Sequence, residues 1–168
     1  MTESHELLET GRRLLALEAT ALDDRCWDDW LALYTSDCEF WIPTWINEEQ
    51  LADDPQSHLS HVYYANRTGL EDRIARIRTG KSPASNPLRR TVHMHSNCLL
   101  LEAQARRSMT LRTAWTCHVF DPNSKKSFML FGHARYTLCC QDGHWLIAKK
   151  KVVIQNDYLP TMLDVYCI

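Results

Sequence analysis

Two histidines stand one residue apart in the segment RTVHMHSN, residues 90–97. The segment is predicted to form a β-strand, in which alternate residues point to the same face. His93 and His95 are therefore expected to lie side by side, with Asn97 next along. Imidazoles placed in this way can ligate a metal, act as a general base, or make hydrogen bonds that only hold the fold.

A mononuclear iron site needs two histidines and a carboxylate that converge on one point. Asp54, His58 and His61 supply these residue types, but they lie in a turn-rich acidic segment with no helix to set their geometry. The RTVHMHSN histidines have no carboxylate nearby in sequence, although His118 and His133 on neighbouring predicted strands could join them across the sheet. Histidines in strands more often fill semi-polar positions and bond locally, so we predict no metal site.

The other familiar chemistries lack their sequence signatures. A Rieske cluster needs Cys and His separated by one residue and later by two, and no such pair exists; Cys117 and His118 are adjacent. The seven cysteines show no C-x-x-C spacing and most lie in apolar patterns, which favours buried reduced thiols. There is no G-x-S-x-G elbow and no glycine-rich phosphate loop among five scattered glycines.

Composition indicates an ordinary globular protein. The 168 residues, 45% hydrophobic and 24% charged, fit a single domain over residues 1–168. A net charge of −2 gives no electrostatic reason to expect nucleic acid or an anionic membrane as partner. The polar, acidic N-terminus has no apolar core of signal-peptide length, and no later segment is long enough to span a bilayer. We therefore expect a cytoplasmic protein.

The first third of the chain is helical in character. Helical spacing of leucines and alanines predicts a helix over 5–22, and a second helix follows that carries Trp27, Trp30, Leu31 and Tyr34 on one face. Four of the six tryptophans fall between residues 27 and 45 and are expected to give at least two buried rings in one aromatic cluster. The remaining elements are a strand closed by Pro43, an acidic loop at 46–57, a strand at 58–65 and a helix at 68–79.

The period changes to two from Arg89 onward. Residues 108–119 alternate strictly, and short turns at DPNSKK and QDG separate three long strands, with Gly132 a candidate bulge or bend. The lysines at 149–151 must alternate faces, which suits a solvated strand or a subunit contact better than an anion site. Helices followed by long hairpin-linked strands predict an α+β fold. We expect a curved antiparallel sheet wrapped round the N-terminal helices, the nuclear-transport-factor-2-like or cystatin-like cone.

Cones of this kind often carry an Asp/His acid–base pair in a pocket, as dehydratases and isomerases do. Candidate carboxylates are Asp24, Asp28 and Asp29, with His93 or His118 as the base. A stand-alone lyase or isomerase is therefore the rival to a non-catalytic role. A polar pocket with a perturbed carboxylate beside a histidine would favour the lyase, and a cone filled with side chains would favour the other role.

Several motifs, in order and at their spacing, resemble one family over nearly the whole chain. They are LDDRCWDDWLALYTSDCEFWIPTW at 22–45, DPQ at 54–56, YYANRTGLEDRIARI at 63–77, RTVH and SN within 90–97, Trp115, FGHARY at 131–136, NDY at 156–158 and DVY at 164–166. The chain resembles the small (β) subunits of aromatic-ring-hydroxylating dioxygenases. NR-x-GLEDR and the NDY…DVY ending are most similar to the benzoate, toluate, anthranilate and 2-halobenzoate branch.

The resemblance implies a non-catalytic cone-fold subunit that scaffolds a catalytic α subunit, commonly as an α3β3 hexamer with β–β contacts. In such systems the α subunit holds the Rieske [2Fe-2S] cluster and the mononuclear Fe(II), and a separate reductase supplies electrons from NADH. No cofactor is then expected in this chain.

The family pattern carries over His93, Ser96 and Asn97, but position 95 is typically not histidine. The resemblance therefore implies no catalytic, cofactor-binding or metal residues here. It suggests that His93 and Asn97 form a hydrogen-bonding row that holds the sheet or a subunit contact.

Overall fold

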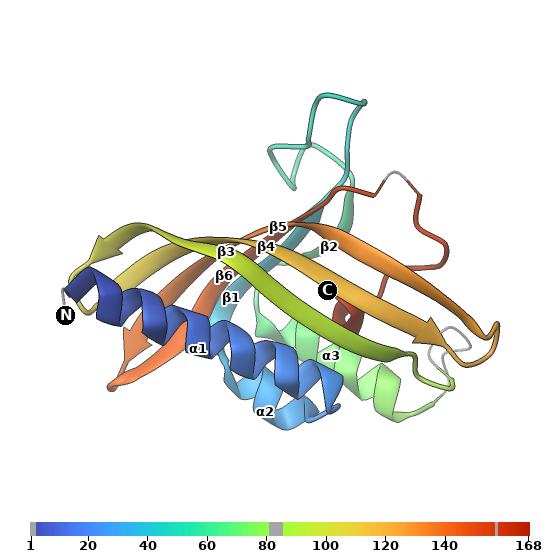
Figure 1. Cartoon of the computed structure of the whole chain (residues 1–168), viewed down its shortest axis with the longest axis horizontal. Coiled ribbons are helices and arrows are strands. Elements are labelled where there is room, and N and C mark those ends of the chain that lie inside the picture. The colour runs from blue at the N-terminus through green and yellow to red at the C-terminus, as the bar shows by residue number, and fades with distance from the viewer. Residues whose placement is uncertain (1–2, 81–85, 157) are drawn as a thin grey trace.

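A computed structural model describes residues 3–80, 86–156 and 158–168 of the chain (Figure 1). The sequence folds into three α-helices, six strands and a short 3-10 helix within these residues. They are α1 (Glu3–Asp23), α2 (Trp27–Ala32), β1 (Tyr34–Pro43), β2 (Ser60–Tyr64), α3 (Arg67–Arg78), β3 (Arg90–Gln104), β4 (Ser108–Asp121), β5 (Lys126–Gln141), β6 (His144–Ile154) and η2 (Val165–Cys167).

The strands form one curved sheet in the order β2-β1-β6-β5-β4-β3. The four long strands from β3 to β6 make the predicted antiparallel meander, and β1 joins β6 in parallel. The helices α1, α2 and α3 lie on one side of the sheet, which we call the inner face (Figure 1). The prediction of an α+β cone around the N-terminal helices is confirmed.

Strict alternation along β4 sends every second side chain to the inner face, and those side chains are buried. The turn between β5 and β6 has positive φ at both Asp142 and Gly143, as a two-residue hairpin requires. Gly132 keeps the register instead of forming the predicted bulge. A Cβ there would lie 1.9 Å from the carbonyl oxygen of Val153, so glycine is required by the close approach of β6.

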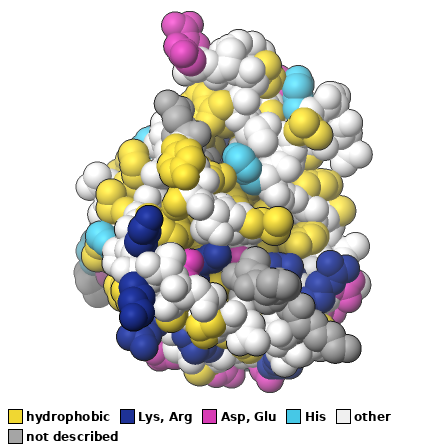
Figure 2. Space-filling model, turned by 90° about the vertical axis from the view of Figure 1, so that its right-hand side faces the viewer, with side chains coloured by type: hydrophobic (Ala, Val, Ile, Leu, Met, Phe, Trp, Pro, Cys, Tyr) yellow, Lys and Arg dark blue, Asp and Glu magenta, His cyan; other side chains and the backbone are white. Residues whose placement is uncertain are grey.

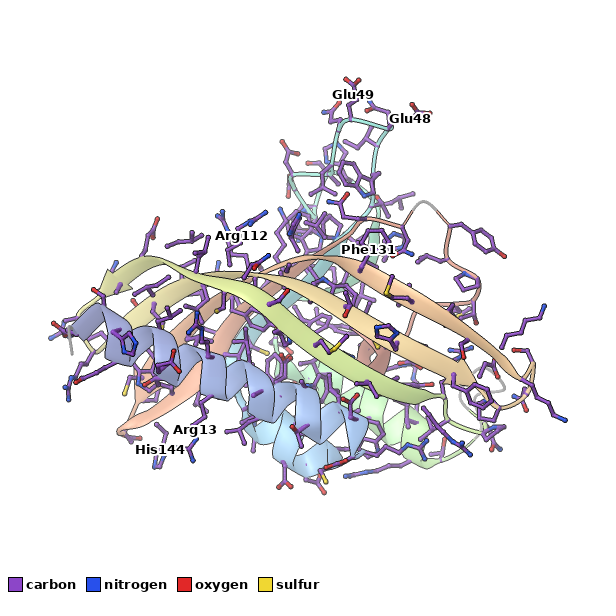
Figure 3. All side chains as sticks on the ribbon, in the orientation of Figure 1. Arg13, Glu48, Glu49, Arg112, Phe131 and His144 are labelled. Atoms are coloured by element: carbon purple, nitrogen blue, oxygen red, sulfur yellow. The ribbon has the colours of Figure 1, made fainter. Side chains whose placement is uncertain are left out.

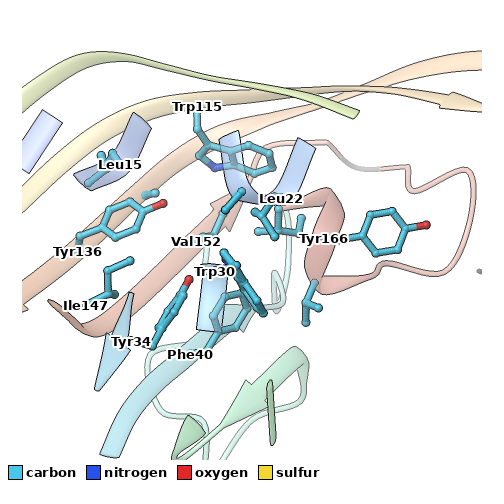
Figure 4. Close-up of a cluster of buried hydrophobic side chains, with 14 of the residues drawn as sticks. Leu15, Leu22, Trp30, Tyr34, Phe40, Trp115, Tyr136, Ile147, Val152 and Tyr166 are labelled. Carbon is cyan, nitrogen blue, oxygen red and sulfur yellow. The ribbon is translucent and has the colours of Figure 1, made fainter. Parts of the chain in front are cut away.

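The core lies between the inner face and the helices (Figure 4). Trp27 and Trp30 are buried in it, which confirms the predicted aromatic cluster. Tyr34 also points inward but opens β1, where the sequence predicts the end of a helix. Trp30 meets the Tyr34 ring edge-on, with centroids 5.2 Å apart. Burying such rings supplies much of the apolar area that stabilises a domain of this size.

A long connection between β1 and β2 protrudes from the opposite side of the sheet, which we call the outer face (Figure 1). A bridge between Trp45 and Leu51 and a hydrogen bond from Ile46 N to Gln50 O give its first part the form of a hairpin. In the described part of the chain, no helix is both long and apolar enough to cross a membrane.

Candidate functional site

The end of α1 delivers a carboxylate to the strand histidines. The Asp23 Oδ1 atom lies 2.6 Å from Nδ1 of His93 and accepts a hydrogen bond from Thr91 Oγ1, while Oδ2 accepts from the His93 backbone N–H. Burial raises the pKa of Asp23, but the hydrogen bonds from His93 and Thr91 outweigh it and hold the pKa below its usual value. Because the ionised carboxylate can only accept, His93 donates from Nδ1, and in a neutral imidazole this arrangement places the lone pair on Nε2.

This tautomer is the one that a general base requires. However, the His93 side chain is only 4% exposed, and Nε2 is buried without a hydrogen-bond partner among the described residues. The void beside it has a volume of about 10 Å³, lined by His93, His95, Trp115 and Tyr136 among others. Such a space holds about one water molecule and no organic substrate. The pair therefore fixes α1 against β3, and the void next to its Nε2 atom is too small for a substrate.

His95 follows His93 on the inner face and meets the ring of Tyr136 edge-on, with centroids 6.0 Å apart. Burial lowers the pKa of His95 to about 4, with the Glu18 charge opposing that shift. The imidazole is thus neutral near pH 7. It acts as a polar ring within the core.

A buried charge network lies next to these rings. Lys150 Nζ donates to Glu18 Oε1 at 2.7 Å and to the Ile168 carbonyl at 3.0 Å, while Tyr136 and Tyr34 donate their hydroxyls to the two Glu18 oxygens. Glu18 and Lys150 are 1% and 3% exposed. Burial raises the pKa of Glu18, but the charge and hydrogen bond of Lys150 outweigh it and lower the pKa below its usual value. The network joins α1 to β1, β5 and β6.

A groove of about 480 Å³ lies between α1 and β3, and its lining includes Asp23, His93 and His95. Its lining is mixed, with Arg12 and Thr20 from α1 and Ser96, Asn97 and Cys98 from β3 among the residues. The His93 Nε2 lone pair is shielded from it, because that atom has almost no accessible surface. The Asp23–His93 pair therefore lines the groove, but its Nε2 atom is buried beneath the groove surface.

The structure corrects the predicted acid–base partners. Asp23, one residue before the predicted candidate Asp24, contacts His93, whereas Asp28 forms an ion pair with Arg78 at 2.8 Å. Among the described residues, neither Asp24 nor Asp29 forms an ion pair with His93 or His118. His118 is exposed on the outer face, paired across the sheet with Met129. Asp23 directly follows the buried residues of α1, and this position is the sequence signal that indicates a carboxylate facing the sheet.

The structure also corrects the predicted row of His93 and Asn97. The register of β3 against β4 shifts between Ser96 and Leu99, and Asn97 adopts a φ of 50° inside this bulge. A bulge re-aims the side chains that follow it. Asn97 is therefore exposed and does not continue the line of His93 and His95.

The predicted metal candidates do not converge. Asp54 accepts hydrogen bonds from Gln56 N and Ser57 Oγ within its own turn, and His58 lies 3.5 Å from Asp53. His118 and His133 project from the outer face, so the sheet separates them from the inner-face pair. Among the residues that the structure describes, no group of three or more His, Cys, Asp or Glu side chains could hold a metal ion.

Comparison with known proteins places this fold in a family. The sequence model described as "Ring hydroxylating beta subunit" matches residues 17–161. This chain belongs to that family. It is 43% identical to the toluate 1,2-dioxygenase subunit beta of Pseudomonas putida, over 99% of each chain. It is 41% identical to the 2-halobenzoate 1,2-dioxygenase small subunit of Burkholderia cepacia, over 89% of this chain and 88% of that one.

A solved β subunit has the same fold. The β subunit of the benzoate 1,2-dioxygenase from Burkholderia mallei superposes with a TM-score of 0.77 at 35% identity, covering 94% of each chain. The predicted resemblance to ring-hydroxylating dioxygenase β subunits is therefore confirmed. Among its motifs, the middle residue of NDY at position 157 lies outside the described residues.

Proposed function

We propose that residues 1–168 act as one domain, the non-catalytic small subunit of a two-subunit ring-hydroxylating dioxygenase. The substrate would be an aromatic carboxylate of the benzoate type, and the subunit would hold catalytic α subunits in a cytoplasmic α3β3 hexamer. The observation that carries the proposal is full-length similarity to a toluate 1,2-dioxygenase subunit beta. The burial of His93 Nε2 supports it, because the void next to that atom holds about one water molecule and no substrate, although the His93 side chain also lines the groove between α1 and β3.

The proposal assigns the redox chemistry to the α subunit. The Rieske cluster and the mononuclear iron would be held there, and NADH would act through a separate reductase. This chain would contribute only the contacts that hold the α subunits in their arrangement. The hydrogen bonds of the buried polar residues support that division, because Glu18, Lys150 and Asp23 are all hydrogen-bonded to other residues of the same chain.

The test is co-expression of this chain with a benzoate-type α subunit. We expect the two to copurify at equal stoichiometry, and benzoate-dependent oxygen uptake, with reductase and NADH, to require both. An α subunit that is fully assembled and active without this chain would contradict the scaffolding role. So would a chain that never copurifies with α.

One observation favours the rival lyase or isomerase, namely the Asp23–His93 pair. The variant His93→Gln separates the two functions, because glutamine keeps hydrogen-bonding capacity but cannot act as a base near neutral pH. A scaffold should show near-normal turnover per intact hexamer. Loss of a general base would lower the rate roughly 10²–10⁴-fold in a hexamer of normal iron content. His118→Gln on the exposed outer face is the matched control.

A further inference from the structure

The outer face of the sheet carries three cations in direct cross-strand register. Arg112 on β4 stands opposite Arg135 on β5, and Arg135 stands opposite Lys151 on β6. Like charges placed directly opposite each other destabilise a sheet. None of the three forms an ion pair with any residue that the structure describes. The row therefore has an unfavourable arrangement that no ion pair among the described residues compensates, although the charges of Asp53 and Glu39 act on Lys151.

The row lines a groove of about 350 Å³ together with Leu51, His133, Ala134 and Val153. Lys151 Nζ lies 4.1 Å from the centroid of the Trp41 ring, which orients the ammonium without neutralising it. Burial and the neighbouring charge of Arg135 lower the pKa of Lys151, and the charges of Asp53 and Glu39 oppose that shift only in part. The groove is thus a concave cationic surface.

Apolar side chains continue the same face beside the cations. Met129 and Phe131 on β5 are 43% and 41% exposed, and Met94 on β3 is 49% exposed. Phe131 pairs with Thr116, which pairs with Met94, so Phe131 and Met94 belong to one row across the sheet. In Figure 2 hydrophobic side chains gather on the part of the surface below the protruding connection. Exposed apolar area next to an unpaired charge row is typical of a protein interface.

The connection between β1 and β2 presents the complementary surface. Residues 46–59, which we call the acidic hairpin, carry exposed Glu48 and Glu49 at the tip and exposed Ile46 and Leu59 at the base. The Asn47 side chain accepts hydrogen bonds from the Glu49 and Gln50 backbone N–H groups, which fixes the tip. Figure 3 shows both glutamates projecting away from the sheet, on the side where Arg112 and Phe131 lie.

The tip glutamates have no ion-pair partner in the described part of their own chain. The groove offers cations with apolar neighbours, and the hairpin offers acids with apolar neighbours. We propose that the acidic hairpin of one copy of this chain docks on the Arg112–Arg135–Lys151 groove of the next copy. This inference rests on the proposed function, for which it names the β–β contact surfaces.

Two different surfaces meet in this contact, so it is heterologous. A heterologous contact closes into a ring when its rotation allows. A ring of three copies would be the β layer of an α3β3 hexamer. Salt should weaken the contact, because exposed charges attract each other over less than about 10 Å at 0.1 M ionic strength and less far at higher salt.

Charge reversal tests the contact. The double variant Arg112→Glu/Arg135→Glu reverses two of the three charges in the row. The like-charge pair between positions 112 and 135 is kept, whereas position 135 then faces Lys151 with the opposite charge. Glu48→Arg/Glu49→Arg reverses the hairpin, and the four changes together restore complementarity. Lys125→Glu/Lys126→Glu, in the exposed turn between β4 and β5, is the matched control. Sedimentation velocity measures the association of each purified chain and of each complex with the α subunit.

We expect the unaltered chain and the control to form trimers. Each double variant should raise the protein concentration at which half of the trimer dissociates by about tenfold or more. A concentration of 1 M NaCl should have a similar effect on the unaltered chain. The fourfold variant should associate again. Persistence of the trimer after row reversal would overturn the proposal, and so would failure of the fourfold variant to recover. If only α binding responds to row reversal, the groove binds the α subunit and not a second copy.

The two proposals fail in different ways. A chain that never copurifies with an α subunit contradicts the proposed function whatever its own oligomeric state. A chain that assembles into an active complex with its row reversed and its β–β association unchanged contradicts only the docking surface. Circular dichroism of each variant confirms that it is folded before association is measured.

Discussion

The two faces of the sheet handle charge in opposite ways. On the inner face, Lys150 is surrounded by Glu18 and the Ile168 carbonyl, and both charged groups are almost fully buried. On the outer face, the next lysine along the same strand, Lys151, joins two arginines, and none of these three cations forms an ion pair among the described residues. Compensated charges fix the position of the helix within one chain. Uncompensated charges are available to a second chain.

The largest expected effect comes from breaking the inner network. Lys150→Met leaves the Glu18 carboxylate buried with two tyrosine hydroxyls and no cation, which typically costs about 3–5 kcal/mol. Urea denaturation should show this loss in the free energy of unfolding. Glu18→Leu/Lys150→Met, which removes both charges, should recover much of it. A single variant that is as stable as the unaltered chain would contradict the network's role.

The inner aromatic cluster should be almost as sensitive. Trp30 is fully buried, and removal of a buried tryptophan ring typically costs about 3–5 kcal/mol. Thermal unfolding of Trp30→Ala should show a large drop in Tm or loss of the folded state. Trp45→Ala is the control, because Trp45 is only partly buried and bonds the Ile154 carbonyl from the connection outside the core. An equal drop in Tm for the two variants would contradict the expected difference between the buried Trp30 and the partly buried Trp45.

His95 should make the inner face sensitive to mild acid. Its folded pKa of about 4 is below the ordinary 6.5, so the unfolded chain binds a proton first as pH falls. The contribution of the neutral ring to the free energy of unfolding is complete above about pH 6.5 and is lost as the pH falls toward 4. The loss amounts to about 3 kcal/mol, because each unit of difference between the folded and unfolded pKa corresponds to about 1.36 kcal/mol. Urea midpoints from pH 7 to 4.5 should fall less steeply in His95→Gln. His118→Gln should retain the full slope.

The smallest effect belongs to the outer row. Arg135→Gln removes the central cation and its repulsion of two neighbours, so the isolated chain should become more stable by about 0.2–1 kcal/mol. The same variant should associate more weakly with its own kind. Urea denaturation at low concentration and sedimentation at high concentration measure the two quantities. If the variant lowered both the free energy of unfolding and the strength of association, the row would stabilise the fold of the single chain, contrary to this prediction.

Sequence periodicity predicted most of the fold. The strict alternation of β4 and the QDG turn predict their elements because side-chain period and positive φ are local properties. Tyr34 was placed on a helix because its spacing from Trp30 and Leu31 also suits one face of a helix. The bulge at Asn97 left no local signal, since it depends on how β3 pairs with β4.

The site was predicted less completely, because its partners are far apart in the chain. The alternation of lysines 149–151 correctly places Lys150 and its neighbours on opposite faces, but it does not identify Glu18 as the partner. A carboxylate in the apolar stripe of α1, flanked by Leu14, Leu15 and Leu22, was the available signal. Asp23 and His93 are 70 residues apart, and only the crossing of α1 over β3 brings them together.

The bulges of β3 also bear on how the free subunit avoids self-aggregation. β3 is a terminal strand of the sheet, 15 residues long, with exposed Val92, Met94 and Leu99. A straight edge of that length and composition would template further strands from other molecules, as in fibril growth. The register breaks at Ser96–Leu99 and at Leu100–Glu102 interrupt its line of backbone donors and acceptors. A subunit synthesised in excess of its partners would thus have an edge too irregular for indefinite strand addition.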